Sequence, residues 1–151
     1  MITFHLMSVR FRWQHRIRLK KWLRQLAAAE KKEMGAVSFI LCSDEELLSI
    51  NRQYLRHDYF TDVITFDYTE NNVLSGDVFI SLDTVRANAG FYRRPPDEEL
   101  RRVMAHGVLH LCGYRDATAG EKRQMRRLEN RYLKKYEALT AGRPAQLKVE
   151  S

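Results

Sequence analysis

The sequence predicts an α/β (α+β) protein with a small, mostly four-stranded sheet covered by about five helices. Short apolar segments rich in β-branched and aromatic residues alternate along the chain with segments whose apolar residues recur at helical spacing. The 151 residues suffice for one domain with a proper core. Hydrophobic residues make up 44% and charged residues 30%, which is typical of a soluble globular protein. We therefore expect a single domain over residues 1–151.

The N-terminal third predicts a strand, a helix and a second strand. Residues 2–7 (ITFHLM) alternate well enough for a strand. Over residues 13–32, apolar side chains recur at helical spacing among basic ones, which predicts an amphipathic helix that Gly35 ends. The apolar segment AVSFILC, residues 36–42, then predicts a buried strand.

A second helix and a hairpin are expected next. Ser43 with Glu46 three residues later is a capping-box pattern, so a helix is expected to begin there and to include SDEELLSINRQYL. The β-branched and aromatic residues 61–68 predict one strand, and residues 76–82 (GDVFISL) predict another. The turn segment NNVLSG between them favours pairing as a hairpin.

The C-terminal half predicts three helices. Residues 82–91 form the first, and the second follows the break RRPPD, with Asp97 as its N-cap and Gly113 as its C-cap. Residues 120–138 form the third, and we expect the tail, residues 139–151, to be loosely held. The predicted order is therefore β-α-β-α-β-β-α-α-α, which favours a small sheet covered by helices.

The apolar segments and the cysteines indicate the cellular compartment. Each apolar segment is well short of the roughly 18 residues that a membrane-spanning helix needs, and no secretory signal pattern is visible. The two cysteines, Cys42 and Cys112, make neither a disulfide framework nor a zinc motif, and we expect Cys112 to lie in the core. We therefore expect a cytoplasmic protein with no membrane partner.

Positive charge is concentrated in two segments. Residues 1–29 hold seven basic residues and no acidic one, while 19 basic and 19 acidic residues cancel over the rest of the chain, so the net +7 comes from this segment. Such a field attracts polyanions such as RNA or DNA, and Arg16, Lys20 and Arg24 are the RNA-binding candidates. The alternative is a solvated helix face. The second basic cluster comprises Lys122, Arg123, Arg126, Arg127, Arg131, Lys134 and Lys135.

The segment HGVLHLCGYRD predicts a metal site at the end of a central helix. His106 and His110, four residues apart, lie on one face of the predicted helix and can direct both imidazoles at one ion. Gly113 turns the chain and lets Asp116 return over the helix end as a third ligand. Two imidazoles and a carboxylate leave coordination positions open, as in a catalytic site for one divalent ion, and zinc is the expected ion.

Gly107 distinguishes this segment from the zinc-protease motif H-E-x-x-H. In that motif the glutamate after the first histidine is the general base, and here the position holds Gly107. A protease mechanism is thereby disfavoured. Asp62 and Asp77 are carboxylates that could act as a base, although residues at the start of predicted strands more often serve as turn or capping groups.

Three segments within residues 51–116 carry a family resemblance. HGVLHLCGYRD resembles the H-G-x-L-H-L-x-G-Y-D-H motif of the YbeY family of metal-dependent endoribonucleases. NRQYLRHDYFTDVITFDY resembles its N-x-x-Y-R-G-K-D-x-x-T-D-V-L-S-F segment, and GDVFISLDTV resembles its G-D-I-x-I-S stretch. The resemblance implies a single-strand-specific enzyme of ribosomal RNA maturation, at the 16S 3′ end, and of late ribosome quality control. It implies ribosomal RNA and ribosomal particles as partners.

The sequence departs from the family pattern at two positions. The family's third histidine falls on Asp116, which lowers the net charge of a divalent site by one and still offers a residue type that ligates zinc well. The family's active-site arginine aligns with Leu55, and Arg56 is the next residue. Either Arg56 takes the catalytic role through a shifted loop, or His57 or another cation takes it, or the role is not filled.

Two other functions fit parts of this pattern. A non-catalytic RNA-binding ribosome-assembly factor with a structural metal would share the basic clusters, but would close its site with four ligands, whereas three are identifiable. An iron oxygenase shares the ligand set, but nothing in the sequence indicates its usual β-barrel. We therefore expect an enzyme in which a divalent ion activates a water or polarises a phosphoryl oxygen, and a guanidinium stabilises the developing charge.

Overall fold

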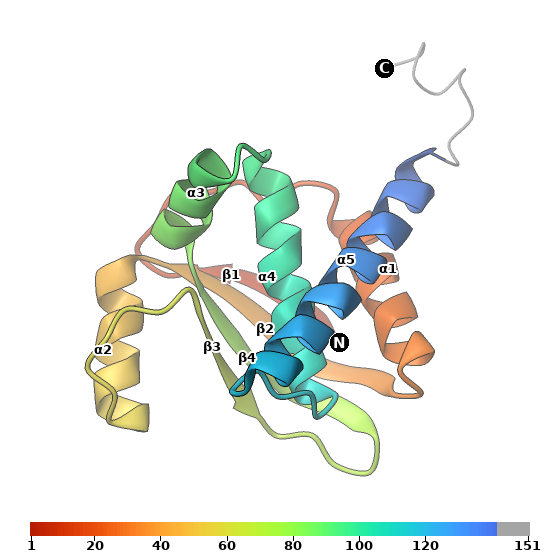
Figure 1. Cartoon of the computed structure of the whole chain (residues 1–151), viewed down its shortest axis with the longest axis horizontal. Helices are drawn as coiled ribbons and strands as arrows, with labels where there is room; N and C mark the ends of the chain where they lie inside the picture. The colour runs from red at the N-terminus through yellow and green to blue at the C-terminus, as the bar shows by residue number, and fades with distance from the viewer. Residues whose placement is uncertain (142–151) are drawn as a thin grey trace.

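In the computed structural model, residues 1–141 are described and form one four-stranded sheet and five helices in the predicted order (Figure 1). The strands are β1 (Ile2–Leu6), β2 (Glu33–Cys42), β3 (Val63–Asp67) and β4 (Val73–Ser81). The helices are α1 (Arg16–Ala29), α2 (Asp44–Leu55), α3 (Leu82–Phe91), α4 (Pro96–Leu111) and α5 (Ala119–Ala141). The predicted α+β fold class is confirmed.

The sheet is mixed, with the strand order β1-β2-β4-β3. β2 pairs in parallel with both β1 and β4, while β3 and β4 form the predicted antiparallel hairpin. The register places Phe4 beside Phe39, Phe39 beside Val78, and Val78 beside Thr65. Because side chains alternate between the two faces of a strand, these four residues form one row on the same face of the sheet.

Helices cover both faces of the sheet, and the larger core lies on the face that carries this row (Figure 1). There α1, α4 and α5 enclose the main cluster, which includes Trp22, Leu23, Phe39, Val78, Met104, Leu109 and Tyr132. On the other face, α2 encloses a smaller cluster of Cys42, Leu47 and Ile64. Cys112 packs against the main cluster but is only partly buried, so its expected place in the core is met in part. Within residues 1–141, no helix is both long and apolar enough to cross a bilayer.

Gly107 lets α4 lie unusually close to the sheet. A Cβ atom at this position would lie 2.7 Å from Cγ1 of Val78 and 3.6 Å from Oγ1 of Thr65. Real Cβ atoms essentially never approach another heavy atom so closely, so glycine is needed for this packing. The contact fixes the height of α4 above β4 and β3, and therefore the position of the histidines on either side of Gly107.

Several predicted boundaries are wrong. The first helix is shorter than predicted, because it ends at Ala29 with Glu30 as C-cap and the chain turns through Lys31 in the left-handed region, at φ 61°. Gly35 does not end the helix but lies inside β2, where a Cβ atom would lie 2.5 Å from the carbonyl oxygen of Leu74. This glycine therefore serves the close approach of two strands.

The ends of the last two helices also differ from the prediction. The N-cap of α4 is Pro95, and Asp97 lies within the first turn. Pro96 occupies the first helical position, where its missing N–H needs no cap. The last helix continues to Ala141, so residues 139–141 are helical and do not belong to a loose tail. The rest of the predicted tail, residues 142–151, lies outside the described residues.

Candidate metal centre

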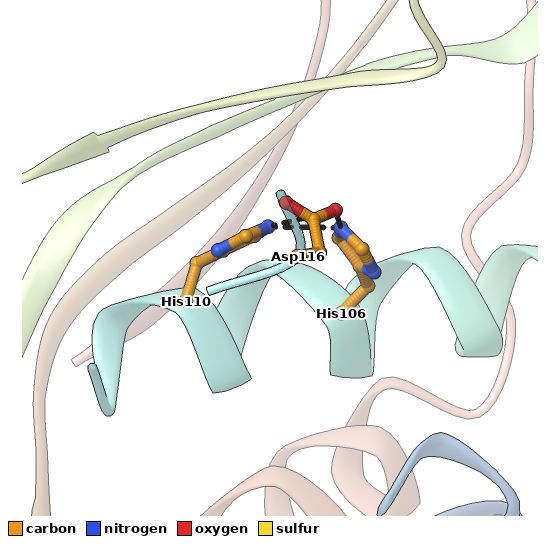
Figure 2. A group of neighbouring side chains, drawn as sticks. All are labelled: His106, His110 and Asp116. Atoms are coloured by element: carbon orange, nitrogen blue, oxygen red, sulfur yellow. Dashed lines mark hydrogen bonds and ion pairs between the residues drawn. The ribbon is translucent and has the colours of Figure 1, made fainter. Parts of the chain in front are cut away.

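The structure brings His106, His110 and Asp116 together. The histidines lie on successive turns of α4, and Asp116, in the segment before α5, lies over both rings (Figure 2). The two Nε2 atoms are 2.9 Å apart, and Oδ2 of Asp116 lies 3.2 Å from Nε2 of His106 and 3.6 Å from Nε2 of His110. The three side chains thus offer ligand atoms that all lie within 4.8 Å of one another, a group that could hold a metal ion.

The hydrogen bonds of the outer ring nitrogens orient both imidazoles. Nδ1 of His106 lies 2.7 Å from Oε2 of Glu129, and Nδ1 of His110 lies 2.9 Å from the carbonyl oxygen of Tyr114. Both partners only accept, so each Nδ1 carries the hydrogen and each neutral ring is left with a lone pair on Nε2. Two such lone pairs and a carboxylate oxygen converge on one point, where they repel one another unless a cation lies between them. This set of donors fits a divalent ion.

The local charges act differently on the two rings. For His106, burial lowers the pKa, but the hydrogen bond and charge of Glu129 and the charges of Asp116 and Asp62 outweigh it, so the pKa is raised. For His110, burial and the neighbouring charge of His106 lower the pKa. The site thus favours one positive charge at its centre, which either a proton on His106 or a bound ion supplies.

Glu129 of α5 is the buried carboxylate that contacts His106. It is 8% exposed, and it accepts a hydrogen bond from Nη1 of Arg102 at 3.1 Å as well as that of His106. Arg102 precedes His106 by four residues, so Arg102, His106 and His110 lie along one face of α4. The sequence carries no local signal for this role, because Glu129 reaches the site only through the packing of α5 against α4.

A second carboxylate anchors the chain between the second and third predicted ligands. The hydroxyl of Tyr114 donates to Oε1 of Glu30 at 2.6 Å, and the hydroxyl of Tyr132 donates to the other oxygen of Glu30. These contacts tie the turn after α4 to the end of α1 and to the buried face of α5. The carbonyl group that orients His110 belongs to Tyr114, so the anchor also fixes that ring.

Two cavities flank the three predicted ligands, and both are lined by Asp62, His106 and Asp116. The first has a volume of about 440 Å³. Its cationic lining residues are Arg94, Arg102, Lys122, Arg123 and Arg126. The second, about 360 Å³, lies along the connection between α2 and β3. Its lining includes Asn51, Leu55, His57, Tyr59, Thr61 and Asp67.

The two carboxylates considered as bases are separated by the fold. Asp62 lies between the two cavities, and burial raises the pKa of its carboxyl group above the ordinary value. Asp77 lies within β4, where it accepts a hydrogen bond of 3.4 Å from the hydroxyl of Tyr68. Only Asp62 of these two adjoins the candidate metal centre.

The predicted catalytic arginine lies beside the second cavity. Arg56 is the C-cap of α2, where it is exposed and lies in the left-handed region at φ 56°. Its neighbours Leu55 and His57 line the second cavity, but Arg56 itself lines neither the first cavity nor the second. Its catalytic role stays a prediction.

The predicted RNA-binding residues lie on α1. Arg16, Lys20 and Arg24 follow one another at four-residue spacing, with Arg16 and Arg24 exposed and Lys20 half-buried. The cations that line the first cavity come instead from α4, α5 and the segment before α4. The structure therefore does not bring the three residues of α1 into the cavities beside the candidate metal centre, and their RNA contacts stay a prediction.

The sequence matches known proteins over most of its length. A family model described as Endoribonuclease YbeY matches residues 8–137. A relative of that name from Phocaeicola vulgatus is 53% identical over 112 residues, which cover 74% of this chain and 81% of the relative. Another, from Cytophaga hutchinsonii, is 43% identical over 130 residues, which cover 85% of this chain and 91% of the relative.

The fold has a counterpart among solved structures. The solution structure of a Thermotoga maritima protein matches with a TM-score of 0.64 and 25% sequence identity, over 97% of this chain and 95% of that one. The family match spans most of the sequence and includes all three residues of the candidate metal centre. The chain therefore belongs to the YbeY endoribonuclease family.

Proposed function

We propose that the protein is a metal-dependent endoribonuclease that cleaves single-stranded RNA in the cytoplasm. Its substrate in this proposal is ribosomal RNA, at the 16S 3′ end and in ribosomal particles subject to late quality control. Family membership supports the endoribonuclease activity. The observation that carries the metal dependence is the convergence of three ligand atoms between two open cavities, because catalytic sites keep positions free for water and substrate.

Different residues of this chain would bind the ion, orient its ligands and attract the RNA. His106, His110 and Asp116 would hold the ion, and Glu129 and the carbonyl group of Tyr114 orient the two rings. A divalent ion bound there, with zinc as the expected one, supplies a Lewis acid for the phosphoryl group or for a water. The cationic side chains of the first cavity attract the polyanionic substrate to the same place.

Proton transfer and charge stabilisation need further groups. Asp62 lines both cavities beside His106 and Asp116, which places its carboxylate next to the ligand atoms, so we assign it the role of general base. Arg56 is our candidate for the guanidinium that stabilises charge on the phosphoryl oxygens. His57, which lines the second cavity, and the cations of the first cavity, among them Arg102, are the alternatives for that role.

The alternative is a non-catalytic RNA-binding factor of ribosome assembly with a structural metal. A structural site is closed by four protein ligands, whereas three donors converge among residues 1–141. The open cavities on both sides of the donors favour the enzyme over this alternative.

The deciding experiment measures metal content and RNA cleavage on the same samples. Protein purified without a chelating affinity tag is first analysed for metal. A single-stranded RNA is then incubated with three samples: this protein, the protein after a chelator has removed its metal, and the metal-free protein after metal has been added back. We expect cleavage only in the presence of metal. His110→Ala should lose both metal and cleavage, while His5→Ala, at an exposed histidine of β1, should keep both. Stoichiometric metal without cleavage would favour the assembly factor.

A further inference from the structure

The connection between α2 and β3 presents two stacked aromatic rings beside the candidate metal centre. The ring centroids of His57 and Tyr59 are 5.2 Å apart with 19° between the ring planes, and the Tyr59 hydroxyl lies 3.0 Å from Nδ1 of His57. Tyr59 is 56% exposed, and both rings line the cavity that His106, His110 and Asp116 also line. A large aromatic surface is thus held open to solvent next to the predicted ligands.

Hydrogen bonds to the backbone of this connection hold these rings in place. Asn51 of α2 is 1% exposed, and its side-chain amide donates to the carbonyl oxygen of Tyr59 at 3.0 Å. The backbone N–H of His57 donates to the carbonyl oxygen of Asn51 at 3.1 Å. Arg52 and Asp58 form an ion pair across the same connection. A ligand that binds to the rings therefore finds them already ordered, which lowers the entropic cost of binding.

We propose that His57 and Tyr59 form a stacking platform for an unpaired nucleobase of the RNA, next to the scissile phosphate. The proposal rests on the proposed function, because it places the substrate of that same site. Base stacking on aromatic side chains needs an exposed ring face and accepts every base. The cavity of about 360 Å³ lies within the range of roughly 300–1,000 Å³ that is usual for small-ligand sites.

The arrangement of the two cavities gives the strand a path. Asp62, His106 and Asp116 line both cavities, so a strand that occupies both must cross the predicted ligands. The first cavity is lined by five cations and four carboxylates, and Arg94 and Arg102 pair with two of those carboxylates. The other three cations, Lys122, Arg123 and Arg126 of α5, suit the phosphates on one side, and the aromatic second cavity suits a base on the other. A base can lie on the platform only after it leaves its own stack, which is easy in a single strand and costly in a duplex. The platform thereby supplies a physical reason for selecting unpaired RNA.

The test is a scan with abasic substrates. A short single-stranded RNA with a mapped cleavage site is synthesised with one abasic residue at each position in turn, and kcat/KM is measured with metal-loaded wild-type protein. We expect one position adjacent to the scissile phosphate at which removal of the base lowers kcat/KM by at least about fivefold. Removal of bases far from that phosphate should have little effect.

Variants then assign this effect to the platform. Tyr59→Ala should lower kcat/KM on the intact RNA by a similar factor and should no longer respond to the sensitive abasic position, because the two changes remove the same contact. Tyr59→Phe keeps the ring and should stay near the wild-type value. The matched control is Tyr68→Ala, at a tyrosine that is 57% exposed and follows β3, outside both cavities. It should respond to base removal as the wild type does.

Two outcomes overturn the proposal while the proposed function stands. Wild-type protein that cleaves RNA and tolerates base removal at every position has no platform, and the exposed rings would then suit a protein partner. Independent effects of Tyr59→Ala and of the abasic residue would place the base elsewhere. The scan of the wild type decides even if Tyr59→Ala does not fold. If the metal-loaded wild type cleaves no RNA at all, the proposed function fails and the platform fails with it.

Discussion

Glu129 accepts a hydrogen bond of 2.7 Å from Nδ1 of His106 across the interface between α4 and α5. Its charge makes the ring a better metal ligand, and its position fixes the ring's orientation. Glu129→Gln should therefore weaken metal binding by about 10- to 100-fold, measured by competition with a chromophoric chelator. Glu137→Gln, at an exposed glutamate of the same helix, is the control. Unchanged affinity in Glu129→Gln would show that this contact does not tune the metal.

Asp62→Asn should raise the stability of the metal-free protein at neutral pH. Burial raises the Asp62 pKa in the folded protein, so the folded state holds this proton more tightly than the unfolded chain. Stability therefore falls as the pH rises from the unfolded value of about 4 through the raised pKa. Metal-free Asp62→Asn should be more stable than the wild type at neutral pH, and the difference should vanish at low pH, as measured by denaturant unfolding.

The same substitution should slow RNA cleavage. If Asp62 is the general base, Asp62→Asn lowers kcat by at least about a hundredfold with metal content unchanged. Asp77→Asn removes the other carboxylate considered for this role, which lies within β4 outside both cavities, and should leave kcat near the wild-type value. Equal rates for Asp62→Asn and wild type would remove Asp62 from the reaction.

The salt dependence of RNA binding tests the basic face of α1. Replacing Arg16, Lys20 and Arg24 together by Gln should flatten the plot of log Kobs against log salt concentration, by about 0.7 for each phosphate of a single strand that these side chains neutralise in the wild type. Arg123→Gln with Arg126→Gln provides the comparison, because both residues line the first cavity. An unchanged slope in the triple variant would make the basic face of α1 an ordinary solvated surface.

Arg56→Ala tests whether Arg56 replaces the arginine that the family pattern places at Leu55. If it does, cleavage should fall by at least about tenfold, equivalent to about 1.4 kcal/mol of transition-state stabilisation, with folding and metal content intact. Arg56→Lys should rescue only part of the rate, because an ammonium group cannot form the bidentate contact. Cleavage by Arg56→Ala at the wild-type rate would shift the role to Arg102 or another cation.

Several features that depend on neighbouring residues in the sequence were predicted correctly. The order of the elements is as predicted, and so is the capping box, in which the side chains of Ser43 and Glu46 bond to each other's backbone N–H. The approach of His106, His110 and Asp116 was also predictable, because it follows from helical spacing and one turn. Each of these features depends on residues close together in the sequence.

Contacts between distant segments were beyond the sequence patterns. The strand order, the hydrogen bond from His106 to Glu129 and the anchoring of Tyr114 by Glu30 all depend on how helices and strands pack. The misjudged boundary at Gly35 has the same cause. A glycine that ends a helix and one that permits two strands to approach closely look alike in a sequence, and only the neighbouring carbonyl group of Leu74 tells them apart.

The contact of Gly107 with Val78 also restricts which residue can follow the first histidine. The position after the first histidine is where zinc proteases of the H-E-x-x-H type carry their catalytic glutamate. Any side chain there would collide with β4, since even a Cβ atom would lie 2.7 Å from Val78. Protease chemistry therefore cannot arise here by a single substitution, because the helix would first have to lift away from the sheet and carry its two histidines with it. Because α4 packs so closely on β4, a reaction at His106 and His110 needs a general base from another part of the fold.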